Sequence, residues 1–222
     1  MKLSTKWLAG ACLWLGVGLR VFSDDIAQTW LLSEPRPTAS GSEPSATVSS
    51  SPARKYQVST INYQLPDVSL INANGDDISL QQLLNAEGPV VLQFVFVTCS
   101  TICPILSASL ASAQADLDQL SNGKQRFISI SIDPEQDTPE QLHAYAKRFK
   151  ADGNWHFLTG TPNDIKNVLK AFDASYAGNN KMFHLALTFM RPGPDSAWRR
   201  INGLLGKQDL IAEYKQMLAM PD

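Results

Sequence analysis

The chain contains 222 residues, of which 44% are hydrophobic and 18% are charged. This composition can bury a hydrophobic core and excludes a wholly disordered chain, and the length allows one ordinary domain with a tail or two small domains. Lys and Arg number 19 and Asp and Glu number 21, so the net charge of -2 argues against a nucleic-acid-binding protein, which normally carries a basic excess. Three cysteines are too few for a disulfide-rich scaffold.

The first 23 residues are typical of a targeting segment. Lys2 and Lys6 precede an uncharged stretch at residues 8–19, which is long for a signal-peptide core and short for a bilayer span of about 20 residues. The basic residues favour export of the chain that follows. We therefore predict a signal peptide, with cleavage after Ser23 as one option, or a signal anchor; a buried core helix is the alternative. Cys12 is interpreted as an ordinary membrane cysteine, because too little apolar sequence precedes it for a lipidation site.

Residues 24–55 are predicted to form a flexible linker. From residue 33 onward this segment is dominated by Pro, Ser, Thr and Ala, and large apolar side chains are nearly absent. Such a composition gives a solvated tether that cannot contribute to a core. The linker would let a folded domain reach away from a membrane surface.

Residues 56–222 are predicted to form one α/β domain with three layers. A run rich in β-branched and aromatic residues predicts a buried strand, and apolar residues at three- and four-residue steps predict amphipathic helices. The alternation of strands and helices favours helices on both faces of one sheet. The expected elements are a hairpin and short helix within 58–84 with a turn at Asn74-Gly75, a strand at 89–97, a helix at 105–120, a strand at 126–132, a helix after Thr138, a helix near Asp164, paired strands at 184–190 and 198–205, and a last helix around Tyr214.

Cys99 and Cys103 are the strongest candidates for chemistry. They follow the predicted buried strand, and ligand sites of open α/β sheets lie at the carboxyl ends of strands. Pro104 suits the first position of a helix, which places Cys103 near the N-cap, where unpaired N–H groups stabilise a thiolate. Two converging thiolates form a soft chelate suited to Cu(I) above all and then to Zn. Two buried structural cysteines or a plain disulfide are the alternatives.

A metal bound by the two cysteines needs a third ligand, and His184 is the best candidate. Its predicted strand follows the Asn179-Asn180 loop, which a three-layer fold brings beside the first strand–helix junction. His143 and His156 are interpreted as surface residues. Met182 has a thioether that suits Cu(I), although packing is the preferred role.

An acidic loop follows the second predicted strand of the domain. Asp133, Glu135 and Asp137 lie within five residues of one another. A solvated turn is the preferred interpretation of these carboxylates. A docking surface is the alternative.

Residues 56–220 resemble the Sco/SenC family of copper-binding, thioredoxin-like proteins. An ordered set of motifs that spans most of the domain carries the resemblance. These motifs are Phe94-x-Phe96-x-x-Cys99-x-x-x-Cys103-Pro104, Ser131-Ile132-Asp133-Pro134-Glu135-x-Asp137-Thr138-Pro139-Glu140, Phe157-Leu158-Thr159-Gly160 and a lone His184.

The resemblance implies a thioredoxin-like fold and a copper site with Cys99, Cys103 and His184 as ligands. It also implies a copper chaperone for the binuclear copper centre of cytochrome c oxidase, with the copper-bearing subunit of that enzyme or another exported copper protein as partner. We expect the protein on the periplasmic side of the inner membrane, tethered by its N-terminal segment. The alternative is a thiol-disulfide oxidoreductase in which Cys99 and Cys103 are the redox pair.

The chain departs from the family pattern at two places. Ser100 and Thr101 stand where proline and an acidic residue are common between the cysteines. Met182 and Phe183 replace the common Val-Asp before the histidine. The second change removes a carboxylate that would be expected to support the histidine or contact the recipient.

Overall fold

A computed structural model describes residues 55–151, 153–178 and 180–220. The predicted targeting segment, Cys12 and the predicted linker up to residue 54 lie outside these residues. Within the described part of the chain, no helix combines the length and apolar character needed to span a bilayer.

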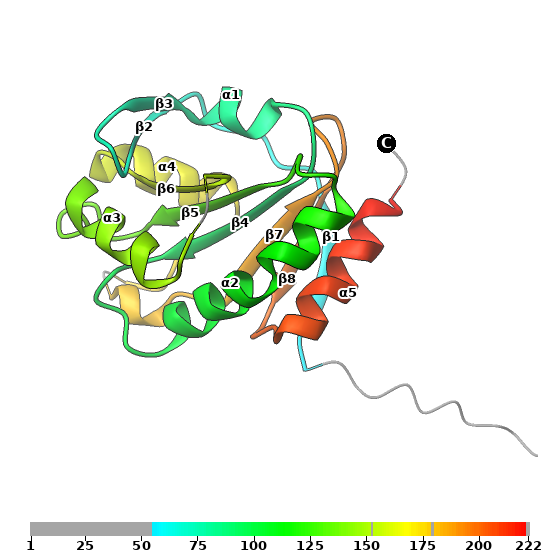
Figure 1. Cartoon of the computed structure of the whole chain (residues 1–222). Helices are drawn as coiled ribbons and strands as arrows, with labels where there is room; N and C mark the ends of the chain where they lie inside the picture. The colour runs from blue at the N-terminus through cyan, green and yellow to red at the C-terminus, as the bar shows by residue number, and fades with distance from the viewer. Residues whose placement is uncertain (1–54, 152, 179, 221–222) are drawn as a thin grey trace, which may run out of the picture. The chain divides into compact units, whose positions relative to one another are not determined.

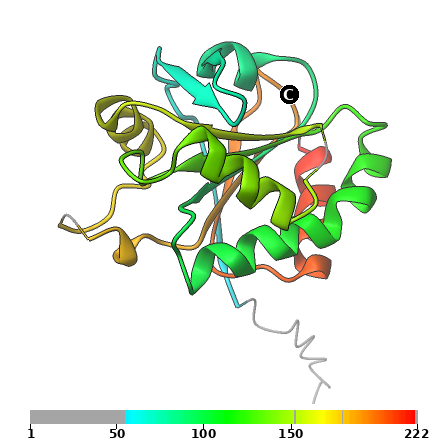
Figure 2. The same cartoon turned by 60° about the vertical axis from the view of Figure 1, so that its left-hand side comes forward.

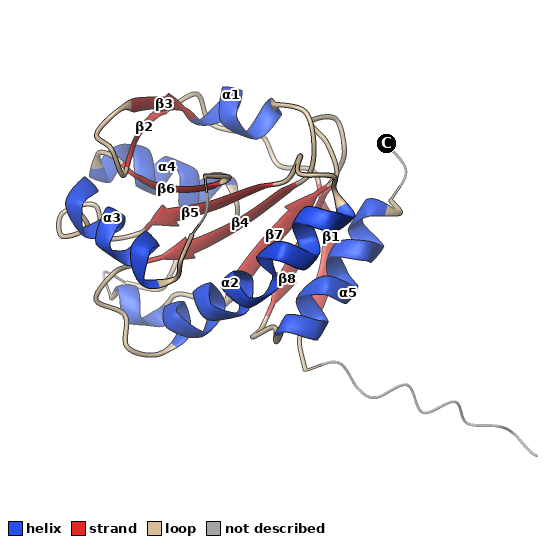
Figure 3. Cartoon of the chain, viewed as in Figure 1, coloured by secondary structure: helices blue, strands red, loops and turns tan. Residues whose placement is uncertain are grey.

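Among the described residues, one sheet of eight strands forms the middle layer, in the order β1-β8-β7-β4-β5-β6-β2-β3 (Figure 3). β4, β5 and β6 run parallel, and the other neighbouring pairs are antiparallel. The strands are β1 (Gln57–Ile61), β2 (Ser69–Asn72), β3 (Asp77–Ser79), β4 (Val90–Val95), β5 (Arg126–Ser131), β6 (Trp155–Thr159), β7 (Leu187–Arg191) and β8 (Trp198–Asn202).

Helices cover both faces of this sheet (Figures 1 and 2). Both α3 and α4 begin at a Thr-Pro pair, in which the threonine side chain caps the helix: Thr138 accepts from Gln141 N, and Thr161 accepts from Asp164 N. The helices are α1 (Leu80–Asn85), α2 (Ile102–Leu120), α3 (Pro139–Arg148), α4 (Pro162–Ala171), the 3₁₀ turn η1 (Lys181–Phe183) and α5 (Lys207–Leu218).

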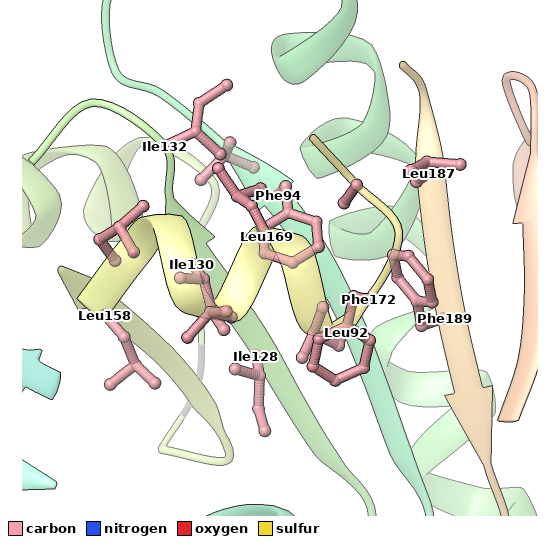
Figure 4. Packing of buried hydrophobic residues seen from close by; sticks show 14 of the residues in the cluster. Leu92, Phe94, Ile128, Ile130, Ile132, Leu158, Leu169, Phe172, Leu187 and Phe189 are labelled. Atoms are coloured by element: carbon pink, nitrogen blue, oxygen red, sulfur yellow. The ribbon is translucent and has the colours of Figure 1, made fainter. Parts of the chain in front are cut away.

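Two hydrophobic clusters lie on opposite faces of the sheet. Alternating side chains of β4 separate them, because Leu92 and Phe94 join one cluster while Val91 joins the other. The first cluster packs α1 and α4 on the sheet, and Figure 4 shows Leu169 and Phe172 of this region against the strands. The second cluster packs α2, α3 and α5 on the other face. The central strand is therefore buried along its whole length.

The segment that precedes β4 contributes to both edges of the sheet. β2 and β3 pair around the turn that contains Gly75, which has a φ of +90°. β1 does not pair with them; it pairs with β8, with Gln57 opposite Asn202 and Ile61 opposite Trp198. Strand order of this kind depends on contacts between distant segments, which local sequence patterns do not specify.

Candidate metal centre

The two cysteines lie where β4 leads into α2, with Cys99 in the connection and Cys103 in the first turn of the helix. Cys99 N donates a hydrogen bond to Phe96 O (3.1 Å), and Cys103 N donates to Cys99 Sγ (3.4 Å). The helix begins at Ile102, so Cys103 is its second residue and Pro104 its third. The predicted start at Pro104 was therefore too late. Proline is tolerated here because the first N–H groups of a helix have no intrahelical partner to lose.

The two thiols differ in their electrostatic surroundings. Burial raises the pKa of the Cys99 thiol, but hydrogen bonds from the backbone of Cys103 and Thr101 outweigh burial, and the net pKa is lowered. Burial, followed by the Cys99 side chain, raises the pKa of Cys103 far above the usual range of a thiol. Cys99 is the more accessible of the two at 5% exposure against 0%, although both are buried. Cys99 is thus the thiol that ionises more readily, whereas Cys103 stays protonated at neutral pH.

His184 reaches these sulfurs from a loop far along the chain. It follows η1, and its Nε2 lies 3.3 Å from Cys103 Sγ across a separation of 81 residues. The ligand atoms of Cys99, Cys103 and His184 all lie within 4.8 Å of one another. Figures 1 and 2 show this loop, in orange-yellow, beside the first turn of α2. The predicted strand began too early, because β7 starts only at Leu187 and His184 precedes it.

The imidazole of His184 is buried and held mainly by packing. Burial lowers its pKa, which favours the neutral form that a metal requires. Its ring centroid lies 5.3 Å from that of Phe96 in an edge-to-face contact. Nδ1 is buried and has no hydrogen-bond partner among the described residues. A ligating histidine is usually fixed by a hydrogen bond at its second nitrogen, so this ring lacks the usual support.

The acidic loop is not the solvated turn that the sequence predicted. Asp137 is fully buried; it accepts from Val97 N (3.1 Å) and from the Ser131 hydroxyl (2.6 Å). Burial raises the pKa of Asp137, while these hydrogen bonds oppose the rise. Asp133 is also buried and forms an ion pair with Lys181. Of the three carboxylates, only that of Glu135 is exposed. Those of Asp137 and Asp133 connect the end of β5 to the cysteine segment and the histidine segment, respectively.

The other residues considered as possible ligands differ in their exposure. His143 is exposed on α3, as predicted. His156 is half-buried between buried neighbours on β6, so it faces outward as predicted but is partly covered, and burial lowers its pKa. Met182 is 47% exposed, which contradicts the preferred packing role. Lys181 was not identified from the sequence, because it belongs to no recognisable motif.

Exposed apolar side chains occur on the chain segments that adjoin this centre. In the described part of the chain, five large hydrophobic residues are exposed. Three lie on the histidine loop, one lies in the first turn of α2, and one follows Gly203, whose N–H donates to Ala186 O (2.8 Å). We call them the apolar rim: Ile105, Met182, Phe183, Leu185 and Leu204. Exposed apolar patches of this kind mark interaction sites.

Comparisons with known proteins agree with this geometry. The profile of the SCO1/SenC family matches residues 62–219. The SCO1 protein homolog of Bacillus subtilis is 35% identical over 165 residues, which cover 70% of this chain and 83% of that protein.

Two solved structures add detail on the fold. The structure of BsSco, described with a disulfide switch and as a member of the Sco family of cytochrome c oxidase assembly proteins, has a TM-score of 0.60 at 29% identity and covers 73% of this chain and 98% of its own. The structure of Arabidopsis thaliana ScoI with copper bound has a TM-score of 0.55 at 26% identity and covers 67% and 96%. The mixed α/β fold of the described domain is therefore thioredoxin-like.

Proposed function

Because this chain belongs to the SCO1/SenC family, we propose that it is a copper chaperone that delivers copper to, or matures, the binuclear copper centre of cytochrome c oxidase. The proposed ligands are Cys99, Cys103 and His184. The observation that carries the proposal is the convergence of these three donor atoms within 4.8 Å. The similarity to ScoI with copper bound and to BsSco, from a family of cytochrome c oxidase assembly proteins, supports the metal and the recipient.

The donor set matches the chemistry of Cu(I). Two thiolates and a neutral imidazole are soft ligands, and a three-coordinate arrangement suits a monovalent ion. The lowered pKa of Cys99 provides one sulfur ready to bind, whereas Cys103 must release its proton to the solvent when the ion enters. Copper is therefore proposed as cargo whose binding depends on the reduced state of both thiols.

The apolar rim supports docking of the recipient. Its five side chains are exposed, whereas the ligands are at most 6% exposed, so a recipient must approach closely before the ion can change ligands. The proposed partner is the copper-bearing subunit of cytochrome c oxidase or another exported copper protein. Contact between the apolar rim and an apolar surface of the recipient would exclude water from the path along which the ion moves.

The proposed location is outside the cytoplasmic membrane, on its periplasmic side. The basic residues and apolar stretch at the N-terminus support export and tethering. The proposed organisation is a signal peptide or signal anchor at 1–23, a flexible linker at 24–55 and the copper-binding domain at 56–222.

Copper titration of the full-length protein in detergent tests the function. We expect one copper per chain in the reduced protein and none in the oxidised protein. His184→Ala is expected to lower Cu(II) affinity by more than about tenfold, since losing a ligand costs at least as much as losing its support. His143→Ala, an exposed histidine on α3, is the matched control and should bind like the wild type. Unchanged binding in His184→Ala would refute this ligand set.

A thiol-disulfide oxidoreductase is the second candidate, favoured by the unequal thiols. The Cys99 thiolate would attack a disulfide of an exported partner and form a mixed disulfide. The Cys103 thiol would then lose its proton and attack Cys99 Sγ, releasing the reduced partner and leaving an internal disulfide. His184 takes no part, so His184→Ala would spare this activity. A reduced chain that retains no copper but readily reduces a partner disulfide would favour this candidate.

A further inference from the structure

We propose that Lys181 and Asp133 are positioning residues whose ion pair holds His184 over the two cysteines. The inference rests on the proposed function, because it concerns how the third ligand of the same copper site is kept in place. Nδ1 of His184 is buried and has no hydrogen-bond partner among the described residues. The ring therefore lacks the hydrogen bond that usually orients a ligating histidine.

The residue next to the histidine does not provide this support. Position 183 carries Phe183, which is 64% exposed and whose side chain has no group that can accept a hydrogen bond from the imidazole. Asn180 helps to shape the turn, since its side chain accepts from Met182 N (3.0 Å), but this contact lies within the loop itself. A local turn of three residues cannot fix its own position relative to the cysteines.

The ion pair ties this turn to the sheet. Lys181 Nζ contacts the Asp133 carboxylate, and the two side chains are 32% and 9% exposed. Asp133 directly follows the β5 region and is itself fixed, because its N–H donates to the Ser131 hydroxyl (3.0 Å) and its carbonyl accepts from Asp137 N (2.9 Å). The lysine is therefore bound to a rigid anchor at the carboxyl edge of the parallel strands.

The position of Lys181 is transmitted to the ring by two short paths. His184 N donates to Lys181 O (3.2 Å), so the backbone of the histidine follows that of the lysine. Lys181 Nζ also lies 5.4 Å from the ring centroid of Phe96, and the same ring makes an edge-to-face contact with the imidazole. Phe96 immediately follows β4 and accepts a hydrogen bond from Cys99 N. The lysine thus packs the histidine against the cysteine segment.

A metal-free experiment tests the positioning directly. In the full-length, copper-free, reduced protein, diethyl pyrocarbonate should modify exposed His143 quickly and buried His184 slowly, as measured by peptide mass mapping. Lys181→Leu is expected to speed modification of His184 by roughly fivefold relative to His143, the factor expected from loss of a partly buried ion pair. Asp133→Asn should give the same increase, and the double variant should add little to either single change.

Two further lysine variants separate positioning from a general loss of charge. Lys181→Arg keeps the cation and should retain the protection of His184. Lys166→Leu removes an exposed lysine that lines the same hollow of about 650 Å³ beside the acidic loop, and it should also leave His184 protected. Equal modification rates of His184 in the wild type and Lys181→Leu would overturn the inference. So would an equal increase in Lys166→Leu.

Copper binding supplies the second measurement. If the wild type binds copper, Lys181→Leu should lower Cu(II) affinity by about tenfold and shift the sulfur-to-copper charge-transfer band, whereas Lys181→Arg should restore both. A wild type that binds no copper would refute the proposed function, and the modification rates would still decide the role of the ion pair. A wild type that binds copper with the same affinity and spectrum as Lys181→Leu would refute the ion pair's role alone.

Discussion

Two segments bring ligands to the same point in different ways. The cysteine turn runs from the end of β4 into the first turn of α2, and the histidine loop contains η1 and His184. The cysteine turn continues the fully buried strand β4 into a helix of 19 residues, and a local hydrogen bond from Cys103 N to Cys99 Sγ links its two sulfur-bearing residues. The histidine loop contains the 3₁₀ turn η1, carries three exposed apolar side chains and is held to the sheet by side-chain contacts, among them the Lys181–Asp133 ion pair. One half of the site is thus part of the core, and the other half is attached to it.

For the proposed copper carrier, this difference predicts a division of roles. Ligands on a rigid element retain the ion, because their geometry does not change when a partner approaches. A ligand on a weakly held loop, next to the surface that a partner would touch, is the one that can leave first. Four experiments test this contrast between the two halves of the site.

Loss of a core ligand should have the largest effect. Cys103→Ser is expected to lower Cu(I) affinity by more than about 100-fold, beyond the range for residues that only support a ligand, since a hydroxyl is a poor ligand for a soft ion. His184→Ala should cost less, because two thiolates still bind Cu(I). Competition with a chromophoric Cu(I) chelator measures both affinities. Equal losses in the two variants would contradict the division of roles.

Removal of the anchor beneath the cysteine turn should come next. Asp137→Ala leaves Val97 N and the Ser131 hydroxyl without their acceptor and is expected to lower the free energy of unfolding by about 1–3 kcal/mol. Denaturant unfolding of the copper-free protein measures this loss. Glu135→Ala, at an exposed position of the same loop, is the matched control and should change stability by less than about 0.5 kcal/mol.

The two thiols should react with alkylating agents at different pH values. A lowered pKa means that Cys99 becomes a thiolate at a lower pH than an ordinary cysteine, whereas the raised pKa of Cys103 keeps it protonated at neutral pH. Iodoacetamide at pH 7 should therefore label Cys99 about tenfold faster than Cys103. Peptide mass mapping over a pH series gives both rates. Faster labelling of Cys103 would reverse the assignment of the attacking thiol.

The smallest intrinsic effect is expected in the apolar rim. Phe183→Ala removes a side chain that is 64% exposed, so stability should change by less than about 0.5 kcal/mol. Copper affinity should stay within about twofold of the wild type, because the ring of Phe183 is not a ligand. Thermal unfolding and copper titration test both statements. A large loss of affinity would show that this residue helps to hold the site and does not serve only as a contact surface.

Local sequence patterns predicted most of the elements that build the cysteine half. The β-branched run before Cys99 marked β4, and the Thr-Pro pair at Thr138 marked the start of α3 at Pro139. Such signals arise from side chains within a few residues of one another. The same reasoning placed the start of α2 too late, because Pro104 fits both the first and the third helical position.

The histidine half depended on tertiary contacts that local patterns do not contain. His184 was selected as the third ligand from its place in the expected topology, and it does lie beside Cys103. Its support by Lys181 could not be foreseen, because the partner Asp133 is 48 residues away in the chain. The burial of Asp137 was missed for the same reason, since its acceptor role depends on Val97, 40 residues away.

The central place of β4 has a consequence for the lifetime of the site. β4 lies between a parallel neighbour and an antiparallel neighbour and is buried at all six positions. Amide hydrogens in such a strand exchange with solvent only when the whole domain unfolds. The cysteine segment is therefore joined to a strand that stays closed until global unfolding, and binding or release of an ion would leave that strand undisturbed.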